Sequence, residues 1–167
     1  RVADHRAGDL DANSVQLSVE AAFFVNYGFM LRSFDALLHP RPPLRPWTAQ
    51  ETRQANRLLA FVRERGTVHP REVDAYFAHG KVINYWGGTS NATTHLLTRM
   101  HYRGMLRVAG REGGIRIYAV REPSPKVSDP RERRHRLDAL IDLIVAAHAP
   151  LPALSFSALV GRLRYAT

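Results

Sequence analysis

The strongest helical pattern in the chain begins directly after a proline-rich stretch. Thr48 and Glu51 have the spacing of a capping box, in which each side chain accepts a hydrogen bond from the other residue's backbone amide. Gly66 follows as a stop signal, so we expect a helix from Thr48 to about residue 65. Its apolar face repeats at the i, i+3, i+4 and i+7 positions Ala55, Leu58, Leu59 and Val62.

Two further helices are predicted before residue 104. The first begins at Pro70, a residue that suits a first helical turn, and should turn Val73, Tyr76 and Phe77 inward. The second is capped by Thr89 or Ser90 and ends near Tyr102, before Gly104. Its inward side is expected at Ala92, Leu96, Leu97 and Met100.

Alternating apolar and polar residues then predict a β-hairpin, with strands at Met105–Ala109 and Ile115–Val120 joined through residues 110–114. We expect Leu106 and Val108 to face inward, and Arg107 outward. In the second strand the expected inward residues are Ile115, Ile117 and Ala119, with Arg116 and Tyr118 on the other side. The order of three helices and a hairpin predicts a mainly α protein built on a winged helix-turn-helix over residues 47–121.

Proline-containing segments delimit this predicted domain on both sides. Residues 1–46 hold an irregular start, an apolar stretch from Glu20 to Phe29 that Gly28 should end, and a short helix capped by Ser33 before the prolines of 39–46. A second linker spans 122–130. Residues 131–167 predict two helices, the later one capped by Ser155, which we interpret as the start of a second, truncated helix-turn-helix. Their expected core positions are Leu137, Leu140, Ile141, Ile144, Val145, Phe156, Leu159, Val160 and Leu163.

The positive charge of the chain indicates a class of binding partner. A formal charge of +9 and a pI of about 10.8 favour a polyanion such as nucleic acid, although an arginine-rich genome is the plain alternative. Cysteine is absent and no apolar run is long enough for a membrane span. We therefore expect a cytoplasmic protein without a membrane partner. The first residue is not methionine and the last directly follows a helical pattern, so we also expect a piece of a longer protein.

The candidate contacts to DNA lie on the third helix and the hairpin. Six arginines fall between residues 99 and 121, and Arg111 at the hairpin tip is the candidate for a phosphate or minor-groove contact. An ordinary solvated helix beside an arginine-rich hairpin is the alternative interpretation. The predicted DNA-binding residues are Asn91, Thr94, His95, Thr98, Arg99, Tyr102, Arg103, Arg107, Arg111 and Arg116.

The sequence gives little support for a metal site, a cofactor site or a catalytic nucleophile. The histidines lack the spacing of a zinc site, and no nucleophile elbow, P-loop or dinucleotide motif occurs, so we expect neither metal nor cofactor. Trp86 is expected in the core. The basic run of residues 131–136 opposes the dipole of the helix that it begins, and is either a second phosphate contact or a solvated end.

Several motifs resemble the winged-helix part of the YcaQ/AlkZ-type DNA glycosylases. They are residues 86–90 (WGGTS), Leu96-Leu97, residues 101–111 (HYRGMLRVAGR) and residues 114–118 (GIRIY), with weaker likeness at residues 1–10 and 23–29. The resemblance implies tandem winged helices around DNA and excision of N-alkylated bases, including those in crosslinks. In that family a Gln-x-Asp or Gln-x-Gln motif positions the attacking water, upstream of the stretch that matches Arg1.

Two functions follow from this reasoning. The chain is the double-stranded-DNA-binding part of a repair glycosylase, or it is a winged-helix regulator or catalytically silent binder. Gln16-Leu17-Ser18 lacks the acidic or amide third residue, so no catalytic role is transferred to it, and we expect the chain by itself to be inactive. A glycosylase part should be monomeric and indifferent to sequence, whereas a regulator would dimerise on a palindrome.

Overall fold

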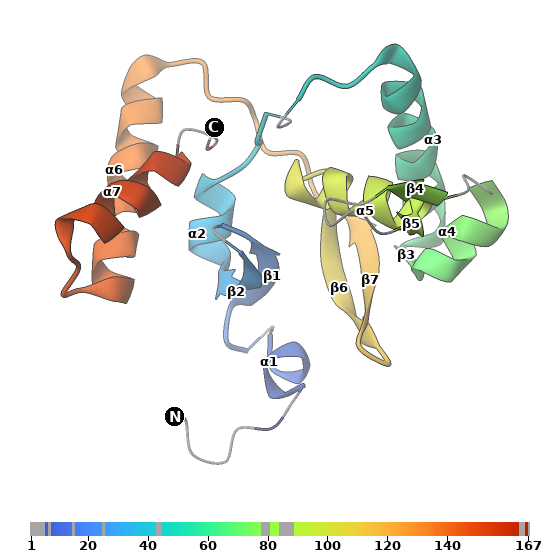
Figure 1. The fold of residues 1–167 in the computed structure, drawn as a ribbon, viewed down its shortest axis with the longest axis horizontal. Helices are drawn as coiled ribbons and strands as arrows, with labels where there is room; N and C mark the ends of the chain where they lie inside the picture. The colour runs from blue at the N-terminus through green and yellow to red at the C-terminus, as the bar shows by residue number, and fades with distance from the viewer. Residues whose placement is uncertain are drawn as a thin grey trace. The chain divides into compact units, whose positions relative to one another are not determined.

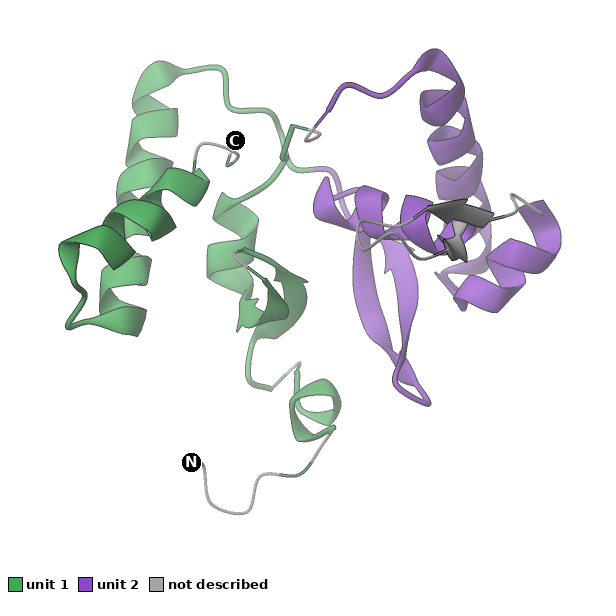
Figure 2. Ribbon diagram, in the orientation of Figure 1, with its two compact units in different colours: residues 1–42, 124–167 green, residues 43–123 purple. Residues whose placement is uncertain are grey.

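The computed structural model describes residues 6, 8–14, 16–24, 26–42, 45–77, 81–83, 89–163 and 166, with only the backbone described at 81–83 and 89–91. Seven helices and seven short strands lie in this part of the chain, and all strand pairs are antiparallel. They form two compact units, residues 43–123 and residues 1–42 with 124–167 (Figures 1 and 2). The predicted fold class, mainly helical with a small β-hairpin, is confirmed in these general terms.

The unit of residues 43–123 follows the predicted order of helices and hairpin, with short strands added. Helix α3 begins at a complete Thr48–Glu51 capping box and ends at Gly66, as predicted. Strand β7 lies between β3 and β6 in a three-stranded sheet. The elements are α3 (Ala49–Arg65), β3 (Thr67–Val68), α4 (Pro70–Phe77), β4 (Lys81–Ile83), β5 (Thr89–Asn91), α5 (Ala92–Tyr102), β6 (Leu106–Glu112) and β7 (Ile115–Val120).

Burial in this unit confirms most of the predicted apolar faces. Helix α3 contributes Leu58 and Val62 to the core, and α5 contributes Leu97 and Met100, each 0% exposed. The sheet covers them with Leu106, Val108 and Tyr118. These side chains bury enough apolar surface on one side of each element to leave the opposite faces of α5 and the hairpin for other roles.

Four predictions in this unit are wrong in detail. Tyr76 is 64% exposed, because it lies on the outer side of Phe61; the centroids of the two rings are 4.6 Å apart. Tyr118, predicted outward, is 2% exposed, because it pairs with Val108 and Val68 in the central strand, while Ile115 is on the surface. Helix α5 begins at Ala92 and not at the residue after Thr89 or Ser90, because residues 89–91 pair with β4.

The hairpin also differs from its predicted outline. Strand β6 continues to Glu112, and the connection to β7 is only Gly113 and Gly114, both with positive φ. The register shifts between Val108 and Gly110, so Ala109 has no cross-strand partner. This is the pattern of a β-bulge, which moves every later residue of β6 to the opposite face.

The second unit consists of α1 (Asp9–Ala12), β1 (Val19–Phe23), β2 (Tyr27–Leu31), α2 (Arg32–Leu37), α6 (Pro130–His148) and α7 (Ala153–Arg162). Its core joins Leu38 to the predicted Leu140, Ile144 and Leu163. An apolar hollow of about 730 Å³ lies against this core, lined by Phe24, Tyr27, Phe29 and Leu159 among others. None of the helices in the described ranges is long and apolar enough to cross a bilayer.

Several boundaries in this unit were predicted incorrectly. Gly28 does not end the Glu20–Phe29 stretch, which forms the β1–β2 hairpin with Gly28 opposite Ala22. Ser33 and Ser155 are not caps, because α2 begins one residue before Ser33 and α7 begins directly after Pro152. Val145, expected in the core, is 42% exposed on α6.

Candidate nucleic-acid interface

The outer side of α5 carries the polar residues that the sequence singled out. Thr94 and His95 are exposed, and Thr98 and Tyr102 are partly exposed. The opposite side holds Leu96, Leu97 and Met100 in the core, together with buried Thr93 and His101. Asn91 lies in β5 just before the helix, and its side chain is outside the described residues. The helix therefore presents hydrogen-bonding side chains away from the core, as a helix that reads a DNA groove requires.

Arg99 and Arg103, on the flank of α5, contact the start of α3. Arg99 Nη1 donates to Glu51 Oε1 at 2.6 Å, and both side chains of this ion pair are about one fifth exposed. The guanidinium carbons of Arg99 and Arg103 lie 5.0 and 4.1 Å from the centre of the Trp47 ring. These cation–π contacts and the ion pair fasten α5 to α3.

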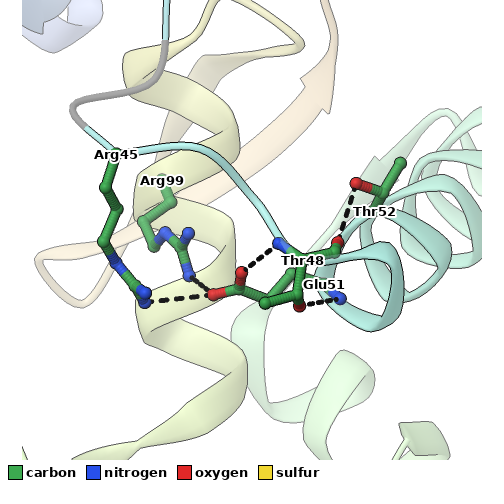
Figure 3. Close-up of polar contacts among 5 residues, drawn as sticks. All are labelled: Arg45, Thr48, Glu51, Thr52 and Arg99. Carbon is green, nitrogen blue, oxygen red and sulfur yellow. Dashed lines mark hydrogen bonds and ion pairs between the residues drawn. The ribbon is translucent and has the colours of Figure 1, made fainter.

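Glu51 organises this corner through four hydrogen bonds (Figure 3). Its carboxylate accepts from the backbone of Thr48, from Arg99 and from Arg45, while its own backbone donates to the Thr48 hydroxyl. The bond from Thr48 and the bond from Arg99 lower the pKa of Glu51 from 4.5 to about 2. Glu51 is therefore ionised throughout the physiological range and fixes the position of Arg99.

The remaining charges at the corner repel one another. Partial burial, followed by the charges of Arg99 and Arg45, lowers the pKa of His95, so the neutral imidazole is favoured at pH 7. Burial and the charge of Arg99 likewise lower the pKa of Arg103. A neutral His95 on an exposed helix face can both donate and accept a hydrogen bond.

The arginines of the hairpin are arranged differently. Arg107 is exposed and lies opposite Ala119, whereas Arg111 lies directly opposite Arg116. Because of the bulge at Ala109, Arg107 and Arg111 project from different faces of the hairpin. Arg111 Nη1 also donates to the Gly114 carbonyl at 3.2 Å, which holds its side chain beside the turn. The hairpin thus presents positive charge on both faces.

The net charge of the chain is concentrated in this unit. Residues 43–123 contain 13 of the 24 lysines and arginines but only 6 of the 15 acidic residues, which leaves formal charges of +7 there and +2 elsewhere. Between Ala92 and Arg121 six arginines accompany a single acid, Glu112. An uneven distribution of this kind is the electrostatic signature of a polyanion-binding surface.

The basic start of α6 in the other unit is largely exposed. Arg131, Arg133 and Arg134 are on the surface, and Arg134 pairs with Asp138 at 3.5 Å. Arg136 is more buried, bonding Glu132 at 3.0 Å and the His39 carbonyl at 3.4 Å. Part of this run therefore has a structural role, and its role towards phosphate stays a prediction.

Sequence reasoning missed Trp47, Arg45 and the second role of Glu51. The available signal was the aromatic residue directly before the Thr48 cap, a position that often packs on the body of the protein. Within the described ranges, no three histidine or acidic side chains gather as metal ligands. Trp86, expected in the core, lies outside the described residues.

A family model described as DNA glycosylase AlkZ-like matches residues 19–166, which include the whole unit of residues 43–123 and most of the other unit. Searches of curated proteins and of solved structures found no match. The family match confirms the resemblance that the sequence motifs indicated.

Proposed function

Because the chain belongs to the AlkZ-like family of DNA glycosylases, we propose that residues 43–123 form a winged helix that grips double-stranded DNA for a repair glycosylase. In this proposal α5 is the recognition helix and the β6–β7 hairpin is the wing. The whole enzyme would act on alkylated or crosslinked bases, as the family relationship suggests.

The observation that carries the proposal is the position of the arginines relative to the core. Six arginines and one acid lie between Ala92 and Arg121, while Leu97 and Met100 of α5 and Leu106 of the hairpin are buried in the core. The element order of α3, β3, α4, α5 and the hairpin, with β3 completing the sheet, supports the same assignment. A basic surface on two adjacent elements of one compact unit suits a duplex backbone.

The chemistry expected at this surface is mainly recognition of phosphate. A repair enzyme must bind duplexes of any sequence, so arginine contacts to the backbone should provide most of the affinity. Thr94, Thr98 and neutral His95 can hydrogen-bond phosphates or base edges without imposing a strong sequence preference. With about five phosphates neutralised, the log–log slope of affinity against salt should be roughly −4 to −5.

The test is a titration of fluorescein-labelled duplex DNA with the full chain, followed by anisotropy at several salt concentrations. We expect binding that is independent of sequence and has this steep salt slope. A flat salt response, or no binding at low salt, would contradict the proposal. Tight dimeric binding to one palindrome in preference to random duplexes would instead indicate a regulator.

Catalysis is tested separately with methylated duplex DNA. We expect no release of 7-methylguanine by the 167-residue chain, because Gln16-Leu17-Ser18 does not match the family's water-positioning motif. Release of the base would show that the catalytic residues lie within this sequence and that their placement is wrong.

A further inference from the structure

The corner between Arg45, Trp47 and the end of α5 holds more positive charge than its structural role needs. Three guanidinium groups gather there, from Arg45, Arg99 and Arg103, around the single carboxylate of Glu51. The Arg99–Glu51 pair and its contact with Trp47 already fasten α5 to α3. Arg45 and Arg103 therefore leave two positive charges in excess at this point.

The three arginines differ in how firmly they are held. Arg99 is fixed at 2.6 Å from Glu51 Oε1 with a side chain 20% exposed, whereas the side chain of Arg45 is 68% exposed and reaches the same oxygen at 3.1 Å (Figure 3). Arg103 has its guanidinium over the Trp47 ring at 4.1 Å. Arg45 and Arg99 thus share one carboxylate oxygen of Glu51, and Arg99 and Arg103 share the ring of Trp47.

Two further observations indicate that an anion would be favourable there. The Nη2 atom of Arg99 is buried and has no hydrogen-bond acceptor among the described residues, so one donor of its fork is unused. Burial, and after it the charge of Arg99, lowers the pKa of Arg103, so the two guanidinium groups repel each other. A phosphate oxygen would relieve this repulsion and accept from guanidinium forks, the geometry that arginine offers to phosphates.

We infer that this corner binds one phosphodiester of the DNA backbone, with Arg45 and Arg103 as its ligands and Trp47 and Glu51 as positioning residues. Glu51 holds Arg99 in place, and Trp47 orients Arg103. The inference rests on the proposed function and adds to it a contact outside the wing, at the entry to α3. Inorganic phosphate shares the same chemistry, so both sources are tested.

The experiment measures the affinity of arginine variants of the full chain for duplex DNA by the same anisotropy titration. Arg45→Ala and Arg103→Met each remove one ligand, and the methionine keeps an apolar side chain on Trp47. Arg53→Ala is the matched control, because Arg53 is an exposed arginine two residues beyond Glu51 and so on another side of α3. We expect each ligand variant to lose about fivefold in affinity and about one unit of salt slope, and the control to lose less than half as much.

The outcomes separate the two proposals. If wild-type protein binds duplex DNA and both ligand variants behave as Arg53→Ala does, the phosphate corner is wrong while the proposed function stands. If wild-type protein does not bind duplex DNA, the proposed function itself fails. Inorganic phosphate, followed by thermal melting, then identifies the source: stabilisation of wild type but not of Arg103→Met by millimolar phosphate would indicate a free-anion site in place of a DNA contact.

Discussion

The arginines on α5 and those on the hairpin were predicted as one DNA-binding set, yet the structure uses them in two ways. Arg99 and Arg103 are partly buried against Trp47 and Glu51 and hold two helices together. Arg111 and Arg116 face each other across two antiparallel strands, where like charges weaken strand pairing. The first pair contributes to folding, whereas the second places two like charges on adjacent strands.

Structural and functional charges in a basic unit differ in what lies beside them. A charge that stabilises the fold has an opposite charge or an aromatic ring beside it, as Arg99 has. A charge placed opposite a like charge gains from an external anion. Substitution of Arg99 should therefore affect stability more than DNA affinity, and substitution of Arg111 or Arg116 should do the reverse.

The largest expected effect is on DNA affinity, when the three hairpin arginines are removed together. Replacing Arg107, Arg111 and Arg116 by alanine should weaken duplex binding about a hundredfold, since each lost phosphate contact is worth roughly 1 kcal/mol. The salt slope should decrease by about 3 in the same titration. The control is the triple alanine variant of the exposed arginines Arg53, Arg57 and Arg63 on α3. An equal loss in the control would mean that net charge alone, and not the hairpin, governs binding.

Glu51→Gln should affect stability more than binding. We expect the free energy of unfolding to fall by about 1 kcal/mol at pH 7, because the amide weakens the cap and the ion pair with Arg99. The pKa of Glu51 is lowered from 4.5 to about 2, so its contribution is present above pH 4.5 and is lost as the pH falls towards 2. Denaturant unfolding at several pH values measures this. A difference between wild type and variant that persists unchanged at pH 2 would contradict the assignment.

Arg116→Thr should raise the free energy of unfolding, whereas Glu51→Gln should lower it. Removing one member of the opposed arginine pair should stabilise the hairpin by about 0.2–1 kcal/mol, and threonine suits a strand. DNA affinity should meanwhile fall about fivefold. Arg107→Thr is the matched control, because Arg107 lies opposite Ala119 and its removal relieves no repulsion. Equal melting temperatures for the two variants would show that the cross-strand repulsion is negligible.

The smallest expected effect is a pH dependence of binding. Burial and the charges of Arg99 and Arg45 lower the pKa of His95, and a DNA phosphate nearby would offset those charges and raise this pKa in the complex. Binding then takes up protons, so affinity should increase about two- to threefold as the pH is lowered from about 7.5 to about 5.5. His95→Gln should flatten this dependence, while the exposed His135→Gln should leave it unchanged. A wild-type affinity that falls on acidification would reverse the assignment.

Local patterns were sufficient to predict the helices of residues 43–123. They did not predict which residues of the hairpin face the core. The capping box at Thr48, the stop at Gly66 and the core positions of α3 and α5 follow from interactions between near neighbours in sequence. The burial of Tyr118 depends on its pairing with Val68 and Val108, contacts across about 50 and 10 residues of sequence. The arginine–tryptophan contacts join residues roughly 50 positions apart in the sequence. A periodic pattern of apolar and polar residues cannot predict such contacts. For the same reason the sequence alone could not separate Arg99 from Arg111.

The unpaired Ala109 has a consequence for how this surface can change during evolution. If the bulge were lost at unchanged chain length, simple alternation along β6 would place Arg111 on the same face as Arg107, away from Arg116. Both arginines would be kept, yet the cationic pattern of the hairpin would be exchanged between its faces. In relatives of this chain, the presence or absence of a bulge between Val108 and Gly110 should therefore say more about how the hairpin meets DNA than the number of its arginines.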